Sequence, residues 1–173
     1  MVPVIKYLCV VAVLYFIVTF MTSCSAINNP THPYISGKKA ILVEGLASYN
    51  IGFVRNAYKD DLERLGYAVF SEPYTVQGPI KADLCIGHSF GAGRLMRSDV
   101  SCDLVITMDA REWKASNNDS YISKHIKHYN FYQSGSFRGY PIKGAINKEI
   151  KGVSHVGLPK KVKDDVMKKI NFE

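Results

Sequence analysis

The sequence predicts an α/β protein with a mostly parallel sheet covered by helices on both faces. Short apolar runs, typical of fully buried strands, alternate along the chain with segments of helical periodicity. The 173 residues are 47% hydrophobic, which is enough to fill one core, and the 21% charged fraction is typical of a globular protein. We therefore expect one folded domain, over residues 39–173, preceded by two shorter segments.

The first segment, residues 1–23, has the layout of a secretory signal peptide. One cation, Lys6, precedes YLCVVAVLYFIVTFM, an uncharged run from Tyr7 to Met21. Because a membrane span needs about 20 apolar residues, this run fits an exported chain better than a permanent anchor.

The end of this segment, MTSCSA, resembles a bacterial lipobox, in which the cysteine, here Cys24, is diacylated and becomes the first residue. Ordinary cleavage near Ser25 and an uncleaved signal anchor remain alternatives, and all three place the domain outside the cytoplasm. Residues 24–38 have no periodic apolar pattern and are expected to be a tether. The favoured prediction is a lipoprotein anchored to a membrane of the bacterial envelope.

The domain begins with a strand and a helix. KAILVEG, residues 39–45, is a short apolar run that ends in glycine, as expected of a buried strand. Residues 51–65 follow as a helix that Gly66 ends. The apolar positions at helical spacing are Val54, Tyr58, Leu62 and Leu65.

The same alternation continues to the end of the chain. Further strands are expected at residues 67–74, 82–89, 102–109, 127–135 and 144–153. A helix over residues 91–99 follows its strand almost without a loop, and the last helix covers residues 159–170, with Pro159 in its first turn. The apolar stripe of that last helix is Val162, Val166 and Ile170.

A GxSxG motif, formed by Gly87, Ser89 and Gly91, lies where a predicted strand passes into a predicted helix. A turn this sharp forces the serine into an unfavourable backbone conformation, and side chains at the flanking positions would collide with neighbouring backbone. The motif therefore predicts an exposed nucleophilic hydroxyl. The alternative is a serine that only caps the helix beginning near Phe90.

A serine nucleophile needs a histidine and a carboxylate at the same edge of the sheet. Asp109 ends its predicted strand at that edge, whereas Asp103 begins the strand and is excluded. Asp119, in a polar loop, is the second candidate for the acid. His155 lies between the last strand and the final helix, in a loop that reaches the carboxyl edge of the sheet.

The other histidines and the cysteines of the domain are assigned no catalytic role. The His88 side chain is expected to point away from that of Ser89, and His125 and His128 lie at the beginning of a strand. Cys85 and Cys102 lie in or beside buried strands, either as free thiols or as a disulfide, and no histidine stands at metal-ligand spacing from them. We therefore predict no metal site and no cofactor.

These motifs resemble the α/β-hydrolase superfamily, particularly small bacterial and phage esterases and lipases, over roughly residues 38–172. The matching pieces are ILVEGLAS, CIGHSFGAG, LVITMD, YNFYQSG and GVSHVGLP. The resemblance implies that Ser89 is the nucleophile, His155 the general base and acid, and Asp109 the residue that orients the imidazole.

The resemblance also implies an oxyanion hole formed by the backbone N–H groups of Phe90 and Leu46. The sequence departs from the family at Glu44, where histidine is common, and in the early position of the acid. It leaves no room for a cap domain between Asp109 and His125, so we expect a minimal hydrolase with an open site.

The predicted function is cleavage of a small-molecule or lipid ester, or a thioester, through an acyl-enzyme. Acyl transfer with the same three residues and a non-catalytic binding lipoprotein on the same scaffold are the alternatives. The net charge of +7 is scattered along the chain, which argues against nucleic-acid binding. Loops 46–50, 72–80 and 111–124 are expected to set the specificity.

Overall fold

The computed structural model describes residues 37–46, 48–111, 122–135 and 137–172. The predicted signal peptide, Cys24, nearly all of the tether and Asp119 lie outside these residues. Among the helices within the described ranges, none is long and apolar enough to cross a membrane.

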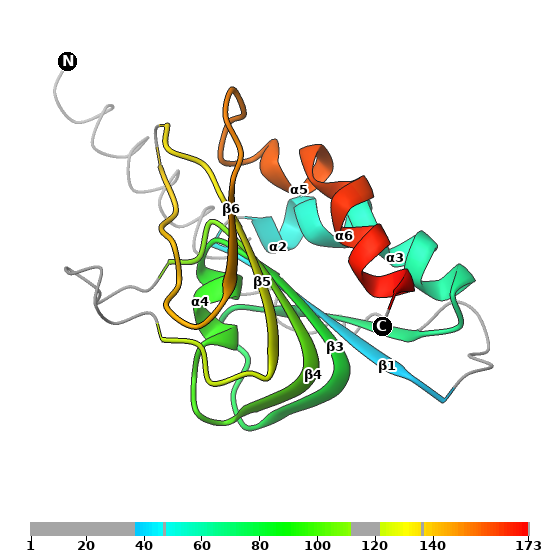
Figure 1. Cartoon of the computed structure of the whole chain (residues 1–173). Coiled ribbons are helices and arrows are strands. Elements are labelled where there is room, and N and C mark those ends of the chain that lie inside the picture. The colour runs from blue at the N-terminus through cyan, green and yellow to red at the C-terminus, as the bar shows by residue number, and fades with distance from the viewer. Residues whose placement is uncertain (1–36, 47, 112–121, 136, 173) are drawn as a thin grey trace, which may run out of the picture.

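The centre of the domain is one six-stranded sheet in which every pairing is parallel (Figure 1). The strands are β1 (Lys39–Glu44), β2 (Ala68–Pro73), β3 (Ile80–His88), β4 (Val100–Met108), β5 (Lys127–Tyr132) and β6 (Ile146–Glu149). Their order across the sheet is β2-β1-β3-β4-β5-β6. β2 is therefore added on one side of β1 and all later strands on the other side, and the strand order reverses between β1 and β3. Ligand sites in such sheets lie beyond the carboxyl ends of the strands at this point.

Helices cover both faces of the sheet, which confirms the predicted fold class. Those on one face are α3 (Phe53–Arg64), α5 (Leu158–Lys161) and α6 (Lys163–Asn171), while α4 (Phe90–Leu95) lies on the other (Figure 1). A single turn, α2 (Ser48–Ile51), follows β1.

Strand alternation divides the apolar side chains between the two faces. Leu84 and Ile86 of β3 pack in the cluster that contains helices α3 and α6, whereas Cys85 packs in the cluster that contains Leu95 of α4. Burial of both faces explains why the central strands read as continuous apolar runs in the sequence.

Two helices differ from their predicted extent. The last helix is divided into α5 and α6 at Val162, which ends one and begins the other, but its predicted stripe is buried. Helix α4 is shorter than expected because the chain turns at Met96, and buried Arg94 then bonds Asp99 and the carbonyls of Val76 and Gly78.

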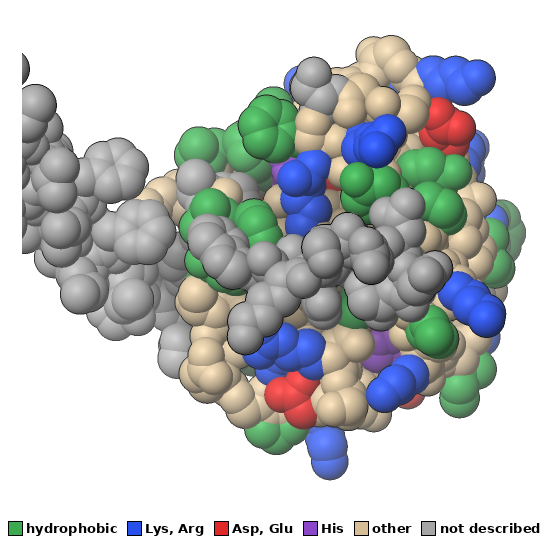
Figure 2. Space-filling model, turned by 90° about the vertical axis from the view of Figure 1, so that its left-hand side faces the viewer, with side chains coloured by type: hydrophobic (Ala, Val, Ile, Leu, Met, Phe, Trp, Pro, Cys, Tyr) green, Lys and Arg blue, Asp and Glu red, His purple; other side chains and the backbone are tan. Residues whose placement is uncertain are grey.

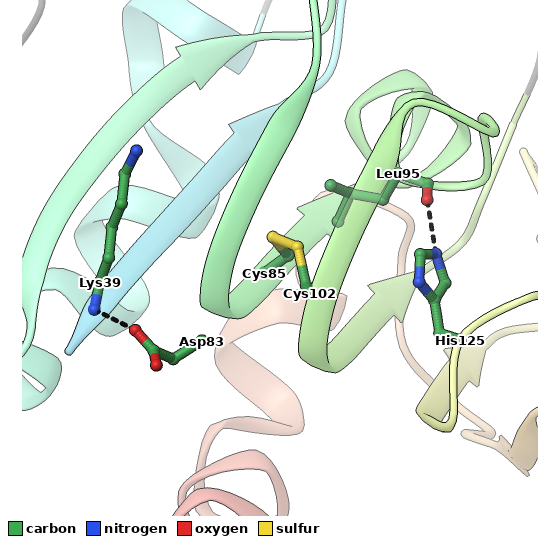
Figure 3. Close-up of a disulfide and its surroundings, with 6 residues drawn as sticks. All are labelled: Lys39, Asp83, Cys85, Leu95, Cys102 and His125. Atoms are coloured by element: carbon green, nitrogen blue, oxygen red, sulfur yellow. Dashed lines mark hydrogen bonds between the residues drawn. A yellow bond between two sulfur atoms is a disulfide. The ribbon is translucent and has the colours of Figure 1, made fainter.

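Cys85 and Cys102 form a disulfide between the neighbouring strands β3 and β4, with their Cα atoms 6.0 Å apart (Figure 3). Both residues are buried on the α4 face of the sheet. The disulfide therefore links the strand that leads to Ser89 with the strand that leads to Asp109.

Candidate active site

Ser89 lies in a sharp turn between β3 and α4. Its backbone angles are φ 57° and ψ −125°, a combination that a residue with a side chain rarely adopts. Its N–H donates to the Met108 carbonyl (2.9 Å), and its carbonyl accepts from the N–H groups of Gly93 and Arg111. Ser89 stands at the N-terminus of α4, but its side chain makes no capping hydrogen bond, so capping does not account for its hydroxyl.

The two glycines of the motif are required by close backbone packing. A Cβ atom at Gly91 would lie 2.1 Å from the Val43 carbonyl oxygen, and one at Gly87 would lie 2.8 Å from the backbone of Ala92. Helix α4 therefore begins directly against the end of β1, and this contact holds the turn in place.

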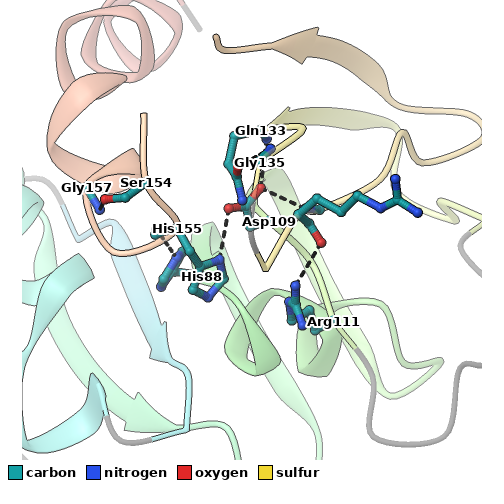
Figure 4. A network of polar contacts seen from close by, with 10 residues as sticks. His88, Asp109, Arg111, Gln133, Gly135, Ser154, His155 and Gly157 are labelled. Carbon is teal, nitrogen blue, oxygen red and sulfur yellow. Dashed lines mark hydrogen bonds and ion pairs between the residues drawn. The ribbon is translucent and has the colours of Figure 1, made fainter. Parts of the chain in front are cut away.

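Asp109 follows β4 and is completely buried. Its Oδ1 accepts hydrogen bonds from the backbone N–H groups of Gln133 (2.9 Å) and Gly139 (3.2 Å). A Cβ at Gly139 would lie 2.6 Å from Oδ1, so only glycine allows this approach. These contacts orient the carboxylate so that Oδ2 faces His155 (Figure 4).

His155 lies in the loop between β6 and α5, and its Nδ1 is 2.9 Å from Asp109 Oδ2. A carboxylate oxygen accepts, so Nδ1 carries the proton and Nε2 is left with a lone pair. The imidazole is 17% exposed while the carboxylate is buried. Within the described residues, no hydrogen bond joins the side chains of His155 and Ser89. Both residues nevertheless lie beside Asp109. His155 is hydrogen-bonded to its carboxylate, and the backbone of Ser89 is hydrogen-bonded to that of Met108 and Arg111, which stand on either side of Asp109 in the chain.

His88 was assigned no role from the sequence, yet the structure places it against His155. The two ring centroids are 4.4 Å apart, and His88 Nε2 lies 2.9 Å from the His155 carbonyl oxygen (Figure 4). Strand alternation could have indicated this contact, because Leu84, Ile86 and His88 share the face of the sheet on which α5 follows His155.

The predicted oxyanion residues lie on two adjoining segments. Phe90 is the first residue of α4, and Leu46, which is 39% exposed, lies in the turn after β1. These segments meet where Gly91 packs against the backbone of Val43 and Glu44. Glu44 is buried, and its Oε1 accepts a hydrogen bond from the backbone N–H of Arg55 (2.8 Å). This bond connects the end of β1 to α3.

His88, Asp109 and His155 are also a possible metal-binding group, since each offers a ligand atom within 4.8 Å of the others. The side chains of His155 and Asp109 are already joined by a hydrogen bond between Nδ1 and Oδ2. That pairing fits proton transfer, whereas chelation at those atoms would require the bond to break.

A groove of about 810 Å³ runs beside the His155 loop, between that loop, α3 and α5. The loop contributes apolar residues to its lining, and α5 and α6 contribute three lysines. The lining residues are Phe53, Asn56, Ala57, Val153, Val156, Gly157, Pro159, Lys160, Lys161 and Lys163. Elsewhere, on the face seen in Figure 2, Lys and Arg side chains stand in separate groups among hydrophobic and uncharged surface.

No protein-family model matches the chain, and no curated protein sequence matches it. Two solved structures are similar. One is the esterase domain of a Rhodothermus marinus protein, at 13% identity and TM-score 0.50, covering 78% of this chain and 88% of the other. The second is a predicted CIB-like hydrolase from Thermoplasma acidophilum, at 14% identity and TM-score 0.54, covering 79% and 86%. At these identities the likeness concerns the fold, which is of the α/β-hydrolase type.

Proposed function

We propose that this chain is a serine hydrolase that cleaves carboxylic esters or thioesters. The observation that carries the proposal is the bond between His155 Nδ1 and buried Asp109 Oδ2, beside a serine held at φ 57° between two obligatory glycines. That strained turn serves no capping purpose, and strain of this kind is retained where it supports a reaction. The hydrolase fold of the two similar structures adds support.

In the proposed reaction, Ser89 Oγ attacks the carbonyl carbon of the ester while its proton passes to His155 Nε2. The bond to the alcohol or thiol then breaks, and the leaving group takes that proton. Water attacks the acyl-enzyme in the same way and releases the acid. Asp109 stabilises the imidazolium, and the N–H groups of Phe90 and Leu46 are proposed to bind the oxyanion.

We also propose that the domain acts outside the cytoplasm, attached to a membrane through acylated Cys24. The support comes from the layout of residues 1–23 and from the disulfide between Cys85 and Cys102, since disulfides persist mainly in oxidising compartments. Palmitate labelling of cells that express the protein tests the anchor. Cys24→Ala should abolish incorporation, and label retained in that variant would contradict it.

The catalytic proposal is tested with a fluorophosphonate probe and a panel of p-nitrophenyl esters of different acyl lengths. The wild type should react with both, and Ser89→Ala should lose both while its melting temperature changes little. Ser101→Ala, a change at an exposed serine of β4, is the matched control and should react as the wild type does. Unlabelled wild type would favour a binding protein, and acyl groups recovered on an added alcohol would indicate a transferase.

A further inference from the structure

We propose that His88 is a positioning residue for His155. His88 joins the loop that carries the base to the strand that carries the nucleophile. The inference rests on the proposed function of Ser89 and His155. It concerns a residue that touches neither substrate nor the reacting hydroxyl and acts through the imidazole beside it.

The position of His88 in the chain makes it suited to this role. It is the last residue of β3 and directly precedes Ser89, so the backbone segment that positions His88 also positions the nucleophile. Its Nε2 lies 2.9 Å from the carbonyl oxygen of His155 itself, 67 residues away. A carbonyl oxygen only accepts, so Nε2 carries the hydrogen and donates it.

The ring of His88 also fixes the orientation of the neighbouring ring. It packs against His155 at a centroid distance of 4.4 Å and an interplanar angle of 36°. The ring of Phe53 meets the His88 ring edge-on, with the two centroids 6.3 Å apart. Because the His88 side chain is 1% exposed, it has little freedom to move. His155 is thus held by Asp109 at Nδ1, by His88 at its carbonyl, and by the His88 ring at its face.

The charge state of His88 agrees with this role. Burial, followed by the nearby His155, lowers the pKa of His88 to about 4, so the ring is neutral near pH 7. A neutral ring places no positive charge beside His155, which becomes a cation during the reaction. His88 Nδ1 is buried without a hydrogen-bond partner, consistent with an uncharged tautomer protonated at Nε2.

The loop that carries His155 needs such a support. Lys151, Gly152 and Ser154 are exposed, and Gly152 has φ 68°. The hydrogen bonds of Ser154 join it to Gly157 within the same loop. The bond to His88 therefore ties an exposed segment to the buried sheet at the residue whose placement matters most, and a displacement of about 1 Å can cost about 10²-fold in rate.

Two substitutions separate the hydrogen bond from the bulk of the ring. His88→Phe keeps an aromatic ring but cannot donate, and His88→Gln places an amide N–H near the position of Nε2. We expect kcat for a p-nitrophenyl ester to fall about 10²-fold in His88→Phe, with KM nearly unchanged, and to recover largely in His88→Gln. If the Phe variant does not fold, His88→Asn, whose amide is too short to reach the carbonyl, replaces it.

His125→Phe is the matched control, because His125 Nε2 also bonds a carbonyl oxygen, that of Leu95, at 2.9 Å, away from the site (Figure 3). It should leave kcat unchanged. The downfield proton NMR signal of His155 Nδ1–H should be lost or broadened in His88→Phe and present in His88→Gln. Unchanged kcat and an unchanged signal in His88→Phe would overturn the inference. If the wild type reacts with no ester or fluorophosphonate, the proposed function fails, while the NMR comparison still tests the support of His155.

Discussion

His155 Nδ1 lies 2.9 Å from Asp109 Oδ2, although 46 residues separate them in the chain. Asp109 accepts hydrogen bonds at its other oxygen from the backbone N–H groups of Gln133 and Gly139. These two bonds set the orientation of the carboxylate independently of His155. The buried carboxylate is thus a fixed point against which the more exposed imidazole is aligned.

The first prediction concerns this fixed carboxylate. In Asp109→Asn the amide oxygen can keep the bonds from Gln133 and Gly139, but its NH₂ then faces Nδ1 and favours the tautomer protonated at Nε2. That tautomer cannot accept the serine proton, so kcat for ester hydrolysis should fall about 10³- to 10⁴-fold. Asp103→Asn, at an exposed position near the start of β4, should retain full activity; equal activity of the two variants would exclude the assignment.

The second prediction concerns the packing of the turn. Gly91→Ala places a Cβ 2.1 Å from the Val43 carbonyl oxygen, where only backbone movement relieves the clash. Unfolding in urea should show a loss of about 3 kcal/mol or more. Gly87→Ala, with its nearest contact at 2.8 Å, should cost less. If Gly87→Ala lost more free energy of unfolding than Gly91→Ala, the close approach of α4 to β1 would be wrong.

The third prediction concerns the disulfide between Cys85 and Cys102, which are 17 residues apart in the chain. A loop of this length gives a stabilisation of about 3 kcal/mol, chiefly by restricting the unfolded chain. The double variant Cys85→Ala/Cys102→Ala should therefore melt at a clearly lower temperature, measured by circular dichroism. Below that temperature it should still hydrolyse ester, because neither sulfur contacts the site. A reducing agent should lower the melting temperature of the wild type but not that of the double variant.

The fourth prediction concerns acid stability. Burial, with a neighbouring histidine as the next cause, lowers the pKa of His88 to about 4 and that of His128 to about 3. An unfolded histidine titrates near 6.5, so below that pH the unfolded chain binds more protons and the free energy of unfolding falls as pH falls. Each residue contributes up to about 1.4 kcal/mol per pH unit in this window. The full stabilisation is present above pH about 6.5.

Urea unfolding between pH 7.5 and 5 measures this slope. His128→Gln should make it shallower, even if the variant is less stable throughout, because His128 also bonds Thr107 and Ser123. Replacing Lys127, which is exposed, with Gln is the control and should leave the slope as it is. A slope that does not change in His128→Gln would mean that this histidine titrates normally in the folded protein.

The fifth prediction concerns the groove beside the His155 loop. If it receives part of the substrate, Val156→Trp, at a half-exposed position in its lining, should raise KM for long-chain esters more than for acetate. The matched change Ile146→Trp lies in a separate groove between β6 and α6 and should not alter KM. The same KM in both variants would place the substrate elsewhere.

Much of this protein is determined by local sequence. The apolar runs and the helical stripes indicated the strands, the helices and their cover on both faces, because burial imposes those periods directly. The spacing of Gly87, Ser89 and Gly91 indicated a strained turn, since steric exclusion acts between residues that are close in the chain or forced together by the turn.

Only the tertiary structure decided which distant groups meet. The contact of His88 with His155, the disulfide of Cys85 with Cys102 and the bonds from Gln133 and Gly139 to Asp109 depend on strand order, register and loop path. Strand alternation indicates the face of the sheet on which His88 lies, but no local pattern identifies any of these partners. The contacts of His88 and Asp109 arise because a parallel sheet places residues that follow separate strands at one edge, where hydrogen bonds of about 3 Å select the partners. The disulfide arises because the strand order makes β3 and β4 neighbours within the sheet.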